Sequence, residues 1–169
     1  MTWTSPIRLA EVPADGLTRD LSPGDEDRAA IAKQLGLVKL DSLRAQVKAK
    51  PWFDGVEVSG AWDARIAQTC GVTLERLESE LSGDFLIHVV PLGSVHAPVD
   101  EDEQEIDPEA MDPPDVAQNG EIDLAAYVVE HLALEIDPFP RKPGVEFVNP
   151  DPVVDLSPFA ALKALKRDG

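Results

Sequence analysis

A strict alternation of apolar and polar residues over positions 43–50 is the clearest pattern in the chain. The apolar members are Leu43, Ala45, Val47 and Ala49, and the polar members are Arg44, Gln46, Lys48 and Lys50. Successive side chains of a strand point to opposite faces, so the pattern predicts a strand with one buried and one wet face. Asp54-Gly55 then predicts a tight turn, and 56–68 is the expected partner strand.

Weaker patterns predict the other elements of the first half. Short strands are expected at 7–12, 17–21, 72–74 and 85–90, the last of them closed by Pro91. A short helix is expected between the turn residues Ser22-Pro-Gly-Asp25 and Gly36, because glycine commonly follows the last residue of a helix.

A broad apolar face marks the main predicted helix, at about 124–136. Leu124, Val128 and Leu132 recur at helical spacing, and Asp123 is suited to cap the N-terminus. We expect this helix to be packed on the sheet. A further helix is expected at the C-terminus, where Ser157-Pro158 forms a helix start and the pattern continues to about Arg167.

Residues 97–119 interrupt these patterns with many acids, four prolines and few large apolar groups. Such a segment buries too little apolar area to offset the entropy lost on ordering, which predicts a mobile acidic loop at about 97–119. The complete pattern predicts an α+β fold over 1–169, organised as one domain. Its antiparallel sheet, which could curl into a partial barrel, would carry the main helix, with the short early helix and the C-terminal helix beside it.

Composition limits the class of protein. With 169 residues and a 43% apolar fraction, the chain can bury one core. No window approaches the length of a membrane span, and no signal peptide is visible. Cys70 is the only cysteine, so an internal disulfide is excluded. We therefore expect a cytoplasmic protein.

The net charge of −17 is concentrated in one stretch of the chain. Residues 77–140 carry 17 acids and no lysine or arginine, whereas the segments before and after that stretch are nearly balanced. A field of this sign repels nucleic-acid phosphates and attracts basic surfaces. It therefore disfavours direct binding to naked RNA, although an acidic loop could also serve only to keep the protein soluble.

No pattern of catalytic or metal-binding residues is found. The three histidines are not at ligand spacing, Cys70 has no cysteine partner, and no phosphate-binding or nucleophile motif occurs. We therefore expect no enzyme activity, no cofactor and no metal, and a buried structural role for Cys70.

The basic side chains give the few candidate contacts with a partner. Arg44, Lys48 and Lys50 share the wet face of the alternating strand, and Arg65 is expected opposite them. A solvated sheet face is the alternative interpretation of this strip. The remaining candidates are Arg141 and Lys142 after the main helix, and the acidic run Asp100, Glu101, Asp102 and Glu103 for a basic partner.

Three segments, in order along the chain, resemble the YceD family, the large ribosomal RNA subunit accumulation proteins. They are Arg65–Cys70, Gly120–Pro140 with its Gly-Glu-Ile-Asp-Leu start, and the Ser-Pro-Phe-x-x-Leu-x-x-Leu-Lys tail from Ser157. Many members of this family carry Cys-x-x-Cys at the central segment. Here Thr73 takes the second place, so a metal bound there in other members would not be expected in this chain.

The resemblance implies a non-enzymatic ribosome biogenesis factor that supports accumulation of the large-subunit RNA. Combined with the charge, it predicts a basic ribosomal protein or an RNA–protein assembly intermediate as the partner. Two alternatives stay open: an acidic inhibitor that mimics nucleic acid, and a metal-dependent RNA-processing enzyme using the acidic stretch.

Overall fold

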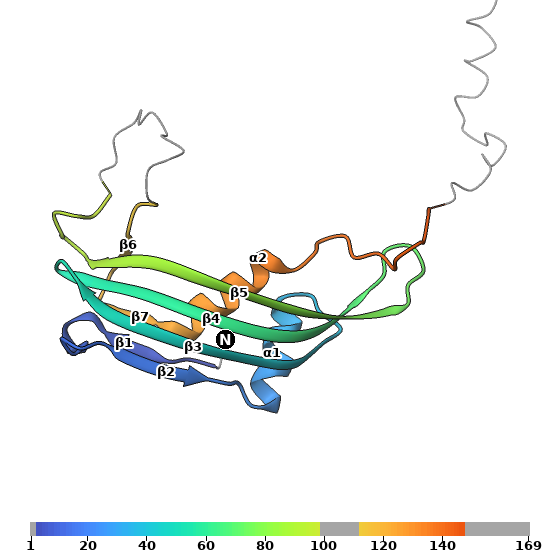
Figure 1. The fold of residues 1–169 in the computed structure, drawn as a ribbon, viewed down its shortest axis with the longest axis horizontal. Coiled ribbons are helices and arrows are strands. Elements are labelled where there is room, and N and C mark those ends of the chain that lie inside the picture. The colour runs from blue at the N-terminus through green and yellow to red at the C-terminus, as the bar shows by residue number, and fades with distance from the viewer. Residues whose placement is uncertain (1–2, 99–111, 148–169) are drawn as a thin grey trace, which may run out of the picture.

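The computed structural model describes residues 3–98 and 112–147, which form two sheets and two helices (Figure 1). The five-strand sheet has the order β2 (Leu17–Leu21), β3 (Lys39–Trp52), β4 (Gly55–Thr69), β5 (Arg76–Pro91) and β6 (Asp115–Ala117). The two-strand sheet pairs β1 (Pro6–Arg8) with β7 (Glu121–Asp123), and the helices are α1 (Asp25–Gln34) and α2 (Leu124–Glu135). The expected α+β class, the early helix and the main helix are confirmed.

The β3–β4 hairpin is the centre of the sheet. Trp52 pairs with Gly55, so Phe53 and Asp54 form the two-residue turn, and the antiparallel pairing continues to Lys39 opposite Ala67. The alternation predicted from the sequence is observed, since Leu43 and Val47 are buried while Arg44 and Lys48 are exposed.

α2 covers the inner face of this sheet (Figure 1). Leu124, Val128 and Leu132 of the helix have no exposed surface and belong to the core. The predicted cap is confirmed: the Asp123 carboxylate accepts hydrogen bonds from the Ala125 N–H at 3.0 Å and the Ser5 N–H at 2.7 Å. Because Ser5 precedes β1, this bond fastens the N-terminal segment to the start of the helix.

Of the predicted strand pair, 85–90 is confirmed as part of β5, which ends at Pro91, whereas the strand at 72–74 is wrong. Leu74 lies in a turn with a φ of 59°, and one antiparallel strand of 16 residues, β5, runs from Arg76 to Pro91. Its inward positions include Ser79 and Gly83, which break the apolar alternation on which a sequence prediction depends. Gly83 is required because a Cβ there would lie 2.9 Å from the Trp62 ring.

The N-terminal strand is shorter than predicted. β1 ends at Arg8, and Leu9–Glu11 forms a 3₁₀ turn instead of continuing to Val12. The Leu9 N–H donates to the Gly120 carbonyl at 2.9 Å, so the chain turns where β1 leaves its partner β7. The strand predicted at 17–21 is confirmed as β2.

The sheet is mixed and open, which corrects two expectations. β6 runs parallel to β5, with Val89 opposite Asp115, so the sheet is not purely antiparallel. The described sheet does not curl into a partial barrel: β2 and β6 are its edges, and β1 and β7 pair separately from it.

β6 also falls within the predicted acidic loop at 97–119, whose last residues therefore form a strand with Ala117 buried. Most of that loop, with Asp100–Glu103, lies outside the described residues, as does the C-terminal helix predicted from Ser157.

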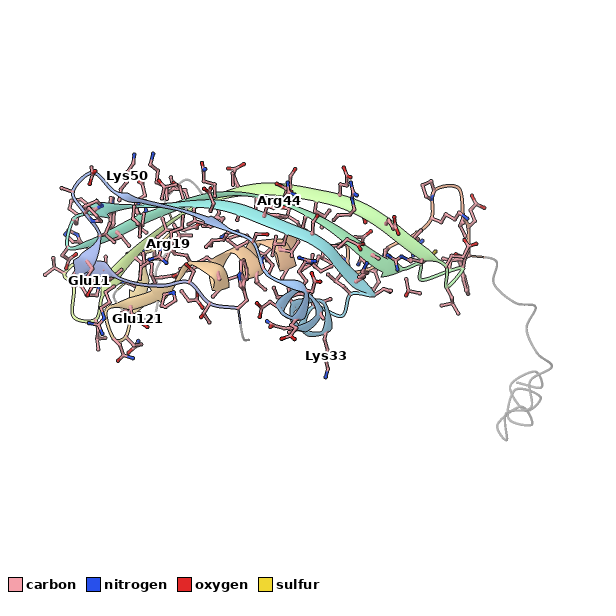
Figure 2. The ribbon with its side chains drawn as sticks, turned by 90° about the horizontal axis from the view of Figure 1, so that it is seen from below. Glu11, Arg19, Lys33, Arg44, Lys50 and Glu121 are labelled. Carbon is pink, nitrogen blue, oxygen red and sulfur yellow. The ribbon has the colours of Figure 1, made fainter. Side chains whose placement is uncertain are left out.

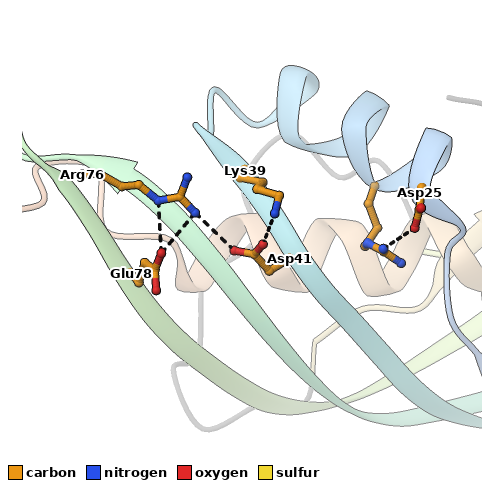
Figure 3. Close-up of polar contacts among 6 residues, drawn as sticks. Asp25, Lys39, Asp41, Arg76 and Glu78 are labelled. Atoms are coloured by element: carbon orange, nitrogen blue, oxygen red, sulfur yellow. Dashed lines mark hydrogen bonds and ion pairs between the residues drawn. The ribbon is translucent and has the colours of Figure 1, made fainter.

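At the end of the sheet farthest from the hairpin turn, β3 has a register shift between Leu40 and Ser42, which places Asp41 outside the regular pairing. Figure 3 shows the polar contacts of Asp41 there. The Asp41 carboxylate contacts the Lys39 ammonium and, at 3.5 Å, the guanidinium of Arg76 in β5. Arg76 also pairs with Glu78 at 3.2 Å. The hydrogen bond from Lys39 is the main cause of the lowered pKa of Asp41, with the charges of Lys39 and Arg76 adding to it. Of the described helices, neither is long and apolar enough to cross a membrane.

Candidate functional site

The outer face of the sheet, opposite α2, carries the basic strip predicted from the sequence. Arg44, Lys48 and Lys50 all lie on this face of β3 and are exposed. Figure 2 shows Arg44 and Lys50 on one side of the sheet, and Arg19 and Lys33 on the side of the helices. The strip spans about 20 Å, at about 3.3 Å per strand residue. Among the described residues, none forms an ion pair with these three cations.

Arg65 lies on the same face but is held by another residue. Its guanidinium donates to the Glu80 carboxylate at 2.5 and 3.1 Å, and Glu80 is directly opposite Arg65 in the β4–β5 register. This hydrogen bond and the charge of Glu80 raise the pKa of Arg65. Arg65 is thus less available to a partner than the three cations of β3.

Charge changes sign across the outer face. Asp63 is opposite Arg44 and Glu57 is opposite Lys50 on the neighbouring strand. On β5 the outward positions include Glu78, Glu80 and Asp84. The face is therefore basic along β3 and acidic along β5, and the chain covers it with no element that the structure describes.

Arg141 and Lys142 are not brought to this strip. The Lys142 ammonium pairs with Glu75 at 2.8 Å beside the β4–β5 connection. Lys50 lies near the β3–β4 turn, at the other end of β4. The β3 strip and the pair Arg141 and Lys142 therefore lie apart, and Lys142 already forms an ion pair with Glu75. The predicted acidic contacts Asp100, Glu101, Asp102 and Glu103 lie outside the described residues.

An aromatic and histidine cluster at the hairpin turn was not predicted as a site. The Trp52 ring stacks on His88 at 4.1 Å, and the exposed Phe53 ring stacks on His96 at 4.3 Å. His88 also contacts Glu57 at 3.4 Å. The sequence shows Trp52 and Phe53 as a turn pair, but His88 joins them only through the β4–β5 register, which places it opposite Glu57. His96 follows β5, where Ser94 accepts from the His96 N–H and donates to Asp54 of the turn.

Cys70 is buried, as predicted, and its sulfur accepts two backbone hydrogen bonds. The N–H groups of Thr73 and Lys142 each lie 3.4 Å from its Sγ. The Thr73 hydroxyl, followed by the N–H groups of Thr73, Lys142 and Val72, lowers the pKa of the thiol to about 6, against the opposing effect of burial. In the described part of the chain, no three His, Cys, Asp or Glu side chains gather closely enough to hold a metal ion.

This arrangement makes the contribution of Cys70 to stability dependent on pH. A thiol whose pKa falls from about 9 to about 6 on folding stabilises the protein fully above pH 9, and this stabilisation is lost as the pH falls towards 6. The loss of stability caused by Cys70→Ala should therefore be larger at pH 9 than at pH 6. Urea unfolding of both proteins across this range measures it. An equal difference at the two pH values would show that folding does not lower the pKa of the thiol.

These features define a small α+β protein with helices on one face of an open sheet and a charged outer face that none of its described elements covers. The chain matches the family model described as "Large ribosomal RNA subunit accumulation protein YceD" over residues 58–166. It therefore belongs to the YceD family, as the sequence motifs indicated. Comparisons with curated proteins and with solved structures give no match. The matched region includes most of β4 and all of β5 and α2, whereas the basic strip of β3 precedes it.

Proposed function

We propose that this chain supports large-subunit RNA accumulation by binding, without catalysis, and that its partner is a basic ribosomal protein or an RNA–protein assembly intermediate. The family name links the chain to accumulation of this RNA. The observation that carries the proposed partner is the bare outer face, which is basic along β3 and acidic along β5.

A face with both signs suits a partner that itself has both signs. The cations of β3 can contact phosphates, and the carboxylates of β5 can contact the basic side chains of a ribosomal protein. Naked RNA would meet only three unpaired cations in this strip. Three phosphate contacts give a slope of about −3 for log K against log salt, far from the six to ten contacts of a strong binder. The net charge of −17 opposes such binding further.

The contribution of the strip is tested by removing two charges on each side of the sheet. Arg44→Ala with Lys50→Ala should weaken binding to purified large-subunit precursors and reduce the salt slope by about 2. The matched control, Arg19→Ala with Lys33→Ala, removes the same residue types from the helix side and should leave the slope unchanged (Figure 2). Equal effects of the two double variants would mean that binding depends only on net charge and that the β3 strip does not contact the precursor.

The identity of the partner is tested by comparing precursors with bare rRNA at two salt concentrations. Binding to precursors should be the tighter of the two and should weaken with salt, because exposed charges are screened over about 8 Å at physiological ionic strength. Changing Asp100, Glu101, Asp102 and Glu103 to their amides should reduce binding to a basic ribosomal protein. Tight, salt-resistant binding to bare rRNA that these substitutions leave unchanged would contradict the proposed partner.

A further inference from the structure

Among the residues that the structure describes, the outer edge of β5 is paired only at the end of the strand. β5 has 16 residues, but β6 pairs only with Val89, Val90 and Pro91. The pairing stops there because Pro113 and Pro114, immediately before β6, have no N–H to donate. Within the described residues, no backbone group bonds to this edge of β5 between Arg76 and His88.

The direction of the free backbone groups follows from the hydrogen bonds at the paired end. The N–H of Leu92, next after β5, donates to the Ala117 carbonyl of β6 at 3.2 Å. Backbone groups alternate in direction along a strand, so the even-numbered residues of β5 direct their N–H and C=O groups to the same edge. Six of them precede His88 on the unpaired length: Arg76, Glu78, Glu80, Ser82, Asp84 and Leu86. This is a row of unpaired donors and acceptors, which can pair with another extended chain.

The two sides of this edge differ in chemistry. On the outer side lie the carboxylates of Glu78, Glu80 and Asp84, of which Glu78 pairs with Arg76 and Glu80 with Arg65. On the inner side Leu77 and Leu81 are only half-buried, because α2 does not cover them fully. An added strand would place alternate side chains on these two sides, so a segment that alternates basic and apolar residues would suit both.

A hollow of about 350 Å³ continues the edge towards β6. It lies between Leu86–His88 of β5 and the exposed side of α2, and is lined there by Tyr127, Glu130 and His131, with Asp112 and Asp115 on the remaining wall. The Tyr127 hydroxyl donates to Asp115 at 2.9 Å, which fixes that wall. The hollow contains three carboxylates and no basic side chain other than histidine, so it is suited to a lysine or arginine side chain.

Charge decides between the candidate occupants. A second copy of the chain would bring its own Glu78, Glu80 and Asp84 against the same residues, which is repulsive. The segment 99–111 of this chain carries seven acids and no base, so it is repelled in the same way. A basic segment of another protein is attracted most strongly to Asp84 and to the carboxylates of the hollow, because Glu78 and Glu80 already pair with Arg76 and Arg65.

We propose that the free edge of β5 binds an extended, lysine- or arginine-rich protein segment as an additional strand, with one of its basic side chains in the hollow beside α2. This proposal takes its class of partner from the proposed function, but the main-chain pairing rests on the geometry of β5 alone. Backbone hydrogen bonds would supply affinity for any extended chain, and the carboxylates would select a basic one.

The test uses the full chain and a fluorescent ten-residue peptide of alternating lysine and valine. The peptide should raise fluorescence anisotropy on binding and slow amide exchange at Glu78–Leu86. A matched peptide with N-methyl groups on every backbone nitrogen has the same charge but has no N–H on either edge to pair with a strand. It should bind at least about tenfold more weakly, a difference of about 1.4 kcal/mol. Equal binding of the two peptides, or unchanged amide exchange, would overturn the proposal.

A substitution in β5 gives an independent result. Ser82→Pro removes one N–H that points to the free edge of β5 and leaves the hydrogen bonds to β4 intact. Proline is tolerated at such edge positions. It should weaken binding of the lysine–valine peptide about tenfold, whereas Ser82→Thr, which keeps the N–H, should bind like the original chain. If Ser82→Pro does not fold, the comparison of the two peptides still tests whether binding requires main-chain pairing. A peptide-sensitive dimer of the chain, seen by light scattering, would assign the edge to a second copy and overturn the proposal.

The peptide assay tests the strand edge and the precursor assay tests the proposed function, so the two proposals can be rejected independently. Binding of the peptide without binding to ribosomal precursors would retain the strand edge and reject the proposed function. Binding to precursors with no difference between the two peptides would retain the proposed function and reject the strand edge as a binding site.

Discussion

Replacing Leu132 with alanine is expected to lower the free energy of unfolding by about 2–5 kcal/mol. The Leu132 side chain is completely buried in the layer between α2 and the sheet. Truncation there removes apolar contacts and leaves a cavity that the β3–β4 hairpin, paired over most of its length, cannot easily fill. The loss would be a large part of the stability of a domain of this size.

Glu130→Ala is the matched control for this change, because Glu130 is exposed on the same helix. It should alter the unfolding free energy by no more than about 0.5 kcal/mol. Urea unfolding followed by circular dichroism measures both variants. Similar, small effects at the two positions would mean that α2 does not pack on the sheet through the face described.

Gly55→Ala is expected to have the second largest effect, a destabilisation of at least about 1–3 kcal/mol. Gly55 closes the two-residue turn opposite Trp52, and a Cβ built there would lie 2.0 Å from the Val89 carbonyl oxygen. Because that atom belongs to the backbone of β5, the clash can be relieved only by moving one of two central strands.

The control is Gly71→Ala, where the nearest atom to a Cβ is the Pro140 oxygen at 3.8 Å. This change should have little effect, or should stabilise slightly by restricting the unfolded chain. Melting temperatures of the two variants would show the contrast. If Gly55→Ala melts no lower than Gly71→Ala, the close approach of β4 and β5 at the turn is not present in solution.

The elements predicted correctly are those whose residues carry their own local pattern. β3 alternates strictly around Val47, and α2 combines a helical repeat with a capping residue, Asp123, so both follow from nearby residues alone. Only 85–90 of β5 was predicted, because the inward positions Ser79 and Gly83 are not apolar. Gly83 is matched to the Trp62 ring on the neighbouring strand, a contact between distant parts of the sequence.

The candidate site shows the same limit. Alternation placed Arg44, Lys48 and Lys50 on one wet face, and the structure confirms that placement. That Arg65 is held by Glu80 depends on the register of β4 and β5, which no local pattern reveals. The open edge of β5 could not be predicted either, because it depends on β6 pairing with only three residues of β5.

The most direct test of the account is capture of partners by the full chain from cell extract at low salt, with proteins and RNA both identified. We expect basic large-subunit ribosomal proteins together with large-subunit RNA, and we expect the proteins to remain after nuclease treatment because the acidic chain holds them directly. The double variant Arg44→Ala with Lys50→Ala should recover less RNA than its control Arg19→Ala with Lys33→Ala. Recovery of RNA alone, with every ribosomal protein lost after nuclease treatment, would contradict the account.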